Sequence, residues 1–458
     1  MSTLSQRFAA FAAATSYADI PASARDRARI HLLDTLGAAI AGSASWEAAI
    51  SREVAAGSPG GAALWGTPDT SAPLAAAFGN GVAAHAFELD DSGGCDHSGA
   101  VVVPALFAAA ALSDTPVDGR TAIEAVVLGY EIARRVQSAL GGYDELNAKG
   151  WHSTGVCGTF GAAVAAGRVL GLDADQLMHA IGLAGSFTGG TWAFLGNGAM
   201  SKRMHVGRAA ETGLHCALLA RSGFTGPSEL FEARWGGFLG LYGGDGADPG
   251  ALVTDLGAGW QVERASIKPY ASCRSTHAAI DALLDVLAEH TLQAEQLAGI
   301  EVRTSPLIAD MCGGRDLESL VTAQLSMPFA LATASLRGTV ALEDVAAPGR
   351  SDPSVQDLMD RVAITVDPAQ SGGSAAPLLR IQLRDGGLIQ RRAGIPLGAW
   401  TNRLPEAATL DKFRALAGTR MAGERVERLA KLVLGIEEVD LAAIALTLTT
   451  RTDPEIIS

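Results

Sequence analysis

The stretch ELDDSGGCDHSGAVVVP, which begins at Glu88, places several carboxylates and a histidine directly before an apolar run. The ordinary pKa of an imidazole lies close to neutral pH, and neighbouring carboxylates raise it because they stabilise the charged form. Glu88, Asp90 and Asp91 could therefore orient nearby histidines and lysines, His97 among them, and set their protonation, which suits general acid/base chemistry. The alternative is a hydrated acidic turn in which Asp91, Ser92 or Asp96 caps the following helix.

Three basic side chains stand at the start of expected helices. His97 precedes SGAVVVPAL, His152 precedes Ser153 in WHSTGVCGTFG, and Lys202 follows Ser201, a candidate N-cap, in SKRMHVGRAAETG. Free backbone amides and the positive end of the helix dipole favour an anion at such a start. Each residue alone is more often structural, but together the three predict a shared anion pocket.

Lysine is scarce in this chain, because arginine supplies nearly all the positive charge. Lys268 precedes Pro269, which favours an extended backbone, and it lies where the helical pattern gives way to strands. Clefts between domains are favoured ligand sites, so Lys268 joins Lys202 as a candidate for binding an anion, with Lys412 expected to be a surface residue. Three other histidines are expected to be structural: His205, His215 and His277.

Charge and composition exclude several classes of protein. The net charge of −14 is opposite to the basic footprint of nucleic-acid binding, so no nucleic-acid partner is expected. The opening segment lacks a signal-peptide pattern and the apolar run containing Pro104 is too short for a membrane span, which predicts a cytoplasmic protein without a membrane partner. The cysteines form neither a CxxC pair nor a zinc spacing, so no disulfide framework and no metal site are expected: Cys95, Cys157, Cys216, Cys273 and Cys312.

The elements that must position these residues follow two patterns. From Pro21 to about Ala265 apolar residues recur with helical spacing, and this pattern returns from about Leu404. Between them, segments such as RVAITVDP and PLLRIQLRDGGLIQRRA alternate apolar and polar residues, which is typical of strands. We predict a mainly α protein with an α+β part: a large all-helical domain built from both chain ends, residues 1–265 and 401–458, and a smaller inserted α+β lid domain, residues 266–400.

Five segments in this order resemble the MmgE/PrpD family, which includes 2-methylcitrate dehydratase, cis-aconitate decarboxylase and iminodisuccinate epimerase: AAHAFELDD, DHSGAVVVPAL, WHSTGVCGTFGAAVAAGRVLGLD, SKRMHVGRAAETG and KPYASCRSTHAAIDA. The resemblance runs over essentially the whole chain. It implies a helical domain with a smaller α+β lid, a homodimer, and a reaction that needs neither a metal nor an organic cofactor. The family's active-site pattern falls on Glu88, Asp91, Ser92, His97, His152, Lys202 and Lys268.

The resemblance also implies a small di- or tricarboxylate as the substrate. We therefore predict a cofactor-independent lyase that removes a proton next to a carboxylate, in the manner of 2-methylcitrate dehydratase. The predicted catalytic residues are His97, His152, Asp91, Lys202 and Lys268, and the predicted substrate-binding residues are Glu88, Ser92, Ser153 and the same two lysines. In these roles the lysines stabilise developing negative charge and the histidines transfer protons.

Two alternatives use the same framework, an epimerase and a decarboxylase of a small di- or tricarboxylate. From a different class, the chain could be a non-catalytic carboxylate-binding protein. Ser98 and Ser153 stand where the family commonly has proline, and Phe329 stands where it often has tyrosine. Loss of that phenol removes a possible proton donor, which places dehydration ahead of decarboxylation.

Overall fold

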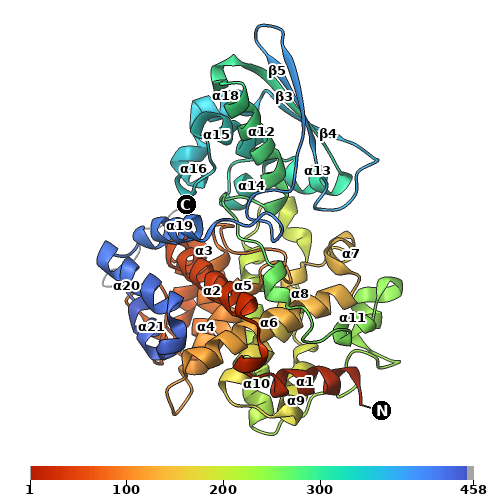
Figure 1. Ribbon diagram of the computed structural model, residues 1–458, viewed down its shortest axis with the longest axis vertical. Coiled ribbons are helices and arrows are strands. Elements are labelled where there is room, and N and C mark those ends of the chain that lie inside the picture. Colours follow the sequence, from red (N-terminus) through yellow and green to blue (C-terminus); the bar gives the residue numbers. More distant parts are fainter. Residues whose placement is uncertain (1, 451–458) are drawn as a thin grey trace.

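The computed structural model describes residues 2–450, and most of this chain is helical (Figure 1). The first helices are α1 (Leu4–Ala14), α2 (Ala22–Gly42), α3 (Trp46–Ala55), α4 (Pro73–His85), α5 (Ser98–Ala110), α6 (Gly119–Ala139), α7 (Gly142–Ala148), α8 (Ser153–Val169), α9 (Ala174–Ala184), α10 (Ser201–Arg221) and α11 (Gly250–Val253). Short turns of helix interrupt the connections at η1 (Tyr17–Asp19), η2 (Trp192–Gly196), η3 (Leu239–Gly243), η4 (Gly244–Gly246) and η5 (Gln261–Arg264). A small hairpin pairs β1 (Ala62–Ala63) with β2 (Thr70–Ser71).

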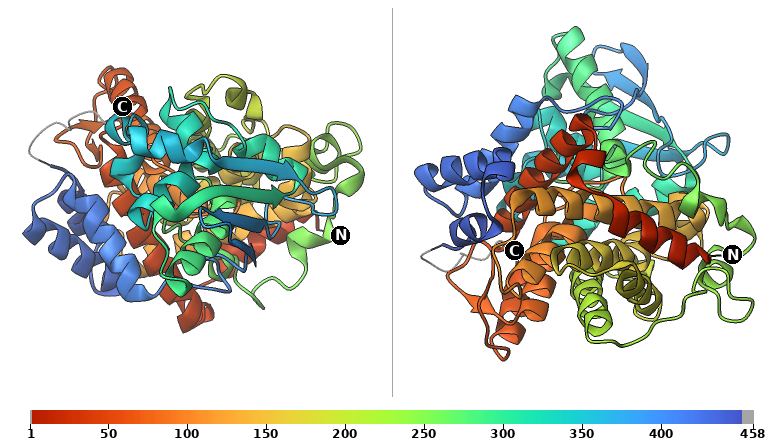
Figure 2. Two further views of the ribbon diagram at one scale, coloured as in Figure 1. Left: turned by 90° about the horizontal axis from the view of Figure 1, so that it is seen from above. Right: turned by 60° about the horizontal axis from the view of Figure 1, so that its bottom comes forward.

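The C-terminal helices return to this helical body. They are α19 (Glu406–Gly418), α20 (Gly423–Leu434) and α21 (Leu441–Leu448), with η8 (Ile436–Glu438) between the last two. Helices α19 and α20 pack against α2, so the C-terminal helices lie beside a helix near the start of the chain (Figure 1; Figure 2). The predicted helical domain made from both chain ends is confirmed.

The middle of the chain forms the smaller α+β part, drawn at the top of Figure 1. Its helices are η6 (Arg274–Thr276), α12 (His277–Glu289), η7 (Ala294–Gln296), α13 (Pro306–Cys312), α14 (Leu320–Gln324), α15 (Met327–Arg337), α16 (Leu342–Val345), α17 (Ala347–Arg350) and α18 (Pro353–Met359). Its strands are β3 (Leu297–Thr304), β4 (Val362–Val366), β5 (Leu378–Leu383) and β6 (Leu388–Arg392). The strand order is β4-β3-β5-β6, with β3 parallel to β4 and the other pairs antiparallel.

One face of this sheet is buried. Alternate residues of the central strands are nearly inaccessible, namely Ile300 and Val302 on β3 and Leu379 and Ile381 on β5, as a period of two requires. They belong to a hydrophobic cluster that also includes Phe87 of the helical part. The lid therefore has its own core and is anchored on the helical domain through shared apolar contacts.

Glycines let the central helices approach closely. A Cβ atom added at Gly161 on α8 would lie 2.4 Å from the carbonyl oxygen of Gly129 on α6, and one added at Gly213 on α10 would lie 2.3 Å from Cβ of Ala162 on α8. Such contacts leave no room for a side chain, so these helices pack closely because their facing residues are small. This packing holds α4, α8 and α10 together, so that their ends meet in one place.

No helix within residues 2–450 combines the length and the apolar character that crossing a membrane requires. The five cysteines are buried, and none is joined in a disulfide.

Candidate active site

Four helix ends bring the predicted basic residues together. His97 is the N-cap of α5, His152 is the N-cap of α8, and Lys202 lies in the first turn of α10. The N-cap of α10 is Met200 rather than the expected Ser201, which is the first helical residue. His85, the last residue of α4, completes the group. Its side chains are deeply buried, with exposed fractions of 0% for His85 and His152, 3% for His97 and 2% for Lys202.

Glu88 links the two lysines. Its Oε1 accepts a hydrogen bond from Lys202, and its Oε2 lies 2.7 Å from Nζ of Lys268. Burial alone would raise the pKa of Glu88, but the charges of Lys202 and Lys268 outweigh it and hold this pKa well below its usual range. Burial opposes the charge on Lys268, yet Glu88 and Asp90 raise its pKa. The result is a buried triad with a net positive charge, which favours an anion.

The loop that carries Glu88 and Asp96 is strained. Glu88 has a φ of 55° and Asp96 has a φ of 95°, both in the left-handed region that non-glycine residues rarely occupy. Such conformations cost of order 1–3 kcal/mol each and persist where the surroundings impose them. In this loop the carboxylates of Glu88, Asp90 and Asp91 face different partners: Lys202, His97 and the backbone of Gly99.

Asp90 is the carboxylate that contacts the histidines. Its Oδ2 lies 2.9 Å from Nδ1 of His97, and its Oδ1 lies 3.1 Å from Nδ1 of His85. The two imidazole rings are 4.0 Å apart between centroids. Burial and the charge of His97 lower the pKa of His85 to about 3, so His85 is neutral and helps to orient Asp90.

Asp91, which the sequence predicted as a catalytic residue, points its side chain away from this group. Its Oδ1 accepts from the backbone N–H of Gly99 at 3.0 Å, and its Oδ2 lies 3.7 Å from Nδ1 of His31. Only its backbone carbonyl oxygen approaches His97, at 3.1 Å from Nδ1. Burial and the charge of Asp90 raise the pKa of Asp91 to about 7. Asp90, rather than Asp91, is therefore the carboxylate placed to influence the protonation of His97.

The two candidate catalytic histidines are driven to opposite protonation states. Burial lowers the pKa of His97, but Asp90 and Asp96 outweigh it and raise this pKa above its ordinary value. Burial, Lys202 and His97 together hold the pKa of His152 well below its ordinary value. These shifts favour the protonated form of His97 and the neutral form of His152. Their ring centroids are 6.1 Å apart.

Several polar atoms of His152 and its neighbours have no hydrogen-bond partner among residues 2–450. They are Nε2 of His152, Oγ of Ser153 and Nε1 of Trp192, and all three atoms are buried. The Trp192 ring lies 5.6 Å from the His152 ring, and Nζ of Lys202 is 5.9 Å from the Trp192 centroid. Buried polar atoms normally have partners, so these atoms mark a place where a polar ligand can bind. The indole of Trp192 was not predicted from the sequence.

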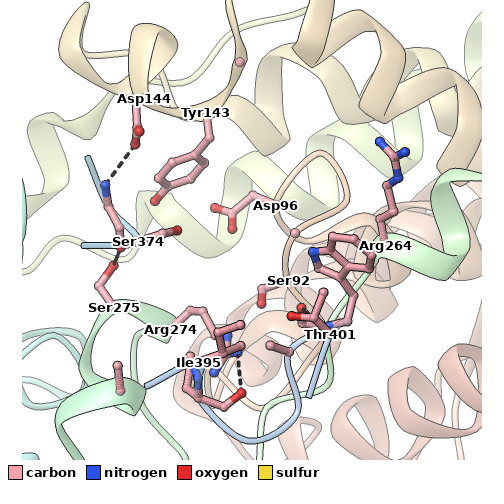
Figure 3. Close-up of a pocket in the computed structure, with 18 of the residues that line it drawn as sticks. Ser92, Asp96, Tyr143, Asp144, Arg264, Arg274, Ser275, Ser374, Ile395 and Thr401 are labelled. Atoms are coloured by element: carbon pink, nitrogen blue, oxygen red, sulfur yellow. Dashed lines mark hydrogen bonds between the residues drawn. The ribbon is translucent and has the colours of Figure 1, made fainter. Parts of the chain in front are cut away.

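Ser92 lies at the edge of the buried group. Its backbone pairs with that of Ser266, with N–H to O distances of 2.9 and 2.7 Å, two residues before Lys268. Ser92 and Asp96 also line a cavity of about 790 Å³ between the helical domain and the lid (Figure 3). Oδ2 of Asp96 is 3.4 Å from Nε2 of His97, so the cavity borders the buried histidines.

The fold brings together groups that could hold a metal ion, although their spacing in the sequence gave no such pattern. Ligand atoms of His85, Asp90 and His97 lie within 4.8 Å of one another, and so do those of Asp96, His97 and His152. The first group is occupied by internal pairing, since Asp90 already neutralises the charge on His97. The nearby positive charge of Lys268 disfavours a cation, and metal independence stays a prediction.

Other expectations meet the structure with mixed results. Lys412 is not a surface residue, because its Nζ donates to Oδ1 of Asp34 at 2.6 Å and its side chain is only 10% exposed. Phe329 lies in the hydrophobic core of the lid. Nε2 of His277 is 3.2 Å from the carbonyl oxygen of Ser272, which fits the expected bracing of a loop. His205 contacts the site directly, since its Nδ1 is 3.2 Å from Nδ1 of His152.

Sequence reasoning missed His85, and it named Asp90 only as one of three carboxylates that could orient the histidines, not as a catalytic or binding residue. Both occur in the segment AAHAFELDD, and a histidine five residues before a carboxylate was the available signal. The residues that were predicted and do meet are Glu88, His97, His152, Ser153, Lys202 and Lys268.

A buried acid and base beside a cationic triad, at the junction of a helical domain and an α+β lid, is the arrangement of an acid/base enzyme. The chain belongs to the MmgE/PrpD family: residues 6–249 match the MmgE/PrpD N-terminal domain and residues 270–438 match the MmgE/PrpD C-terminal domain. Among its relatives is the cis-aconitate decarboxylase of Aspergillus terreus, 30% identical over 446 residues, which cover 92% of this chain and 90% of that protein. The human (Homo sapiens) cis-aconitate decarboxylase is 27% identical over 445 residues, covering 93% of this chain and 90% of that protein.

Proposed function

We propose that the protein is a cofactor-independent lyase for a small di- or tricarboxylate, and that its reaction is decarboxylation of a tricarboxylate of the cis-aconitate type. The observation that carries the lyase proposal is the opposite protonation of His97 and His152 beside the two buried lysines. The relatives are cis-aconitate decarboxylases, which favours decarboxylation over the dehydration predicted from the sequence. A homodimer, a cytoplasmic location and the division at residues 265 and 401 remain parts of this proposal.

The residues divide the chemistry between charge stabilisation and proton transfer. Lys202 and Lys268 bind a carboxylate of the substrate, with Oγ of Ser153 as a further donor. In decarboxylation the bond from carbon to one carboxylate breaks, CO₂ leaves, and the electron pair moves through the neighbouring double bond to a carbon that takes a proton. His97 supplies that proton. One well-placed donor to the developing charge contributes about 3–4 kcal/mol, and a positioned acid contributes roughly 10²–10⁴-fold.

Dehydration is the second candidate, and one observation favours it. Elimination of water needs a base for the proton and an acid for the departing hydroxide, whereas decarboxylation needs only the acid. His152 is neutral and its buried Nε2 has no partner within residues 2–450, so it could take a proton while His97 protonates the leaving group. The Phe329 side chain packs in the hydrophobic core of the lid, so its presence gives no reason to prefer dehydration or decarboxylation.

The test is to incubate the purified protein with cis-aconitate, 2-methylcitrate and related acids in D₂O and to follow the products by NMR. Decarboxylation predicts that CO₂ is released and that the product gains one deuterium from the solvent. His97→Gln should abolish turnover, whereas the exposed lid residue His290, changed by His290→Gln, should leave it intact. Loss of water in place of CO₂ would support dehydration, and absence of any reaction or exchange would contradict the lyase proposal.

A further inference from the structure

The cavity between the helical domain and the lid has more basic than acidic side chains in its lining. Three arginines line it: Arg134 from α6, Arg264 at the end of η5, and Arg274 from η6. Its volume of about 790 Å³ falls in the roughly 300–1,000 Å³ range of small-molecule sites. Figure 3 shows Arg264 and Arg274 around the space that Ser92 and Asp96 border. We call it the arginine cavity.

The arginines of this cavity are not neutralised by ion pairs. None of the three lies within 4.0 Å of a carboxylate oxygen of residues 2–450. The nearest acid to Arg134 along α6 is Glu131, but its oxygens accept from Nε of Arg135 at 2.5 Å and from the N–H of Gln261 at 2.7 Å. Burial lowers the pKa of Arg134, and the positive charge of Arg264 lowers it further.

Arg274 is in a similar position. Asp281 raises its pKa against a larger lowering by burial, but the oxygens of Asp281 accept from the hydroxyl of Tyr270 and the N–H of Leu397, both at 2.6 Å. Arg274 itself makes only long bonds, at 3.4 and 3.5 Å, to the carbonyl oxygens of Leu397 and Pro396. Two acids border the cavity: Asp96 faces His97, and Asp144 accepts from the N–H of Gly373 at 2.9 Å.

A second observation points to a ligand. Gln137, one turn after Arg134 on α6, lines the same cavity and is only 6% exposed. Its Nε2 is buried and has no hydrogen-bond partner among residues 2–450. An unpaired buried donor costs about 1–3 kcal/mol, and an acceptor oxygen from a ligand in the cavity would remove this cost.

We infer that the arginine cavity is a carboxylate-recognition subsite, which holds a remote carboxylate of the substrate while the reacting end lies at His97 and His152. The inference rests on the proposed function, because it assigns the two ends of one polyanionic substrate. A guanidinium presents paired N–H donors that match a carboxylate. Asp96 joins the two places, since it lines the cavity and lies 3.4 Å from Nε2 of His97. The subsite selects di- and tricarboxylates over monocarboxylates.

The test uses tricarballylate, a saturated tricarboxylate without a leaving hydroxyl or a double bond, as an unreactive probe in calorimetry. Arg134→Gln and Gln137→Leu should weaken its binding, roughly ten- to hundredfold for the arginine, as loss of a charge-assisted bond implies. Arg221→Gln, which removes an exposed arginine at the end of α10 outside the cavity, should leave binding unchanged. Circular dichroism confirms that each variant is folded.

The outcomes separate this inference from the proposed function. If tricarballylate binds the wild-type protein and the cavity variants equally, the subsite does not exist, whether or not the enzyme turns over a substrate. If the variants lose binding but no acid is converted by the wild-type protein, the subsite stands and the lyase proposal fails. Inorganic phosphate at equal ionic strength should compete poorly, and phosphate that displaced tricarballylate at equal concentration would overturn the carboxylate assignment. With a substrate in hand, Arg134→Gln should raise KM more than it lowers kcat.

Discussion

Replacing Asp90 by asparagine removes the carboxylate that lies 2.9 Å from Nδ1 of His97. Burial opposes the charge on His97, and Asp90 is the largest influence that raises its pKa. A neighbouring opposite charge shifts a pKa by about 1–3 units, so the pKa of His97 should fall by that amount. This corresponds to about 1.4–4 kcal/mol less stabilisation of the imidazolium. Asp96, 3.4 Å from Nε2, remains and preserves part of the upward shift.

The assay is the pH dependence of kcat, in which the alkaline limb reports the protonated acid. Loss of the carboxylate makes the protonated form less stable, so Asp90→Asn should move this limb to lower pH by about 1–3 units. Asp91→Asn is the matched control, because the Asp91 side chain faces Gly99 rather than His97, and it should move the limb less. An alkaline limb that stays in place in Asp90→Asn, or moves equally in both variants, would refute the assignment of Asp90.

Three further predictions concern stability and metal dependence. Glu88→Gln leaves two buried ammonium groups without their shared anion and should destabilise the protein by about 3–5 kcal/mol, more than Lys268→Met, in denaturant unfolding. Lys268→Met should nevertheless lose turnover, whereas the exposed Lys431→Met should retain it, and equal activities would contradict the anion-binding role. Because the pKa of Asp91 is raised to about 7, the folded state binds its proton more tightly, and stability falls as pH rises from about 4 to about 7. Asp91→Asn should gain about 4 kcal/mol relative to wild type between pH 4 and pH 8, and an equal difference at both pH values would count against the raised pKa. Turnover should survive exhaustive chelation, and a loss restored by Fe²⁺, Mg²⁺ or Zn²⁺ would show that the buried histidine cluster holds a metal.

Local patterns in the sequence were sufficient to predict the fold class and the starts of several helices. The alternation in RVAITVDP became β4, and His97 and His152 stand directly before α5 and α8 as predicted. These features depend on periodicity and on residues close in the chain, which a single sequence records.

The choice between Asp90 and Asp91 could not be made from the sequence. Neighbouring residues in an irregular loop point in directions that depend on backbone dihedrals, and the φ of 55° at Glu88 is imposed by tertiary contacts. Burial of the lysines was also beyond local patterns, since Glu88 pairs with Lys202 at a separation of 114 residues and with Lys268 at 180 residues. The same holds for Lys412, which was expected at the surface and pairs with Asp34 across 378 residues.

The central claim is that His97 and His152 carry opposite protonation states in one buried site. Nitrogen NMR of protein labelled with ¹⁵N only in its nine histidines reads the protonation of each ring directly, and spectra of His97→Gln and His152→Gln assign the two signals. At pH 7 the His97 ring should show both nitrogens protonated, and the His152 ring should show one protonated and one unprotonated nitrogen. Two neutral rings, or a charged His152 beside a neutral His97, would contradict the acid and base roles given to these residues.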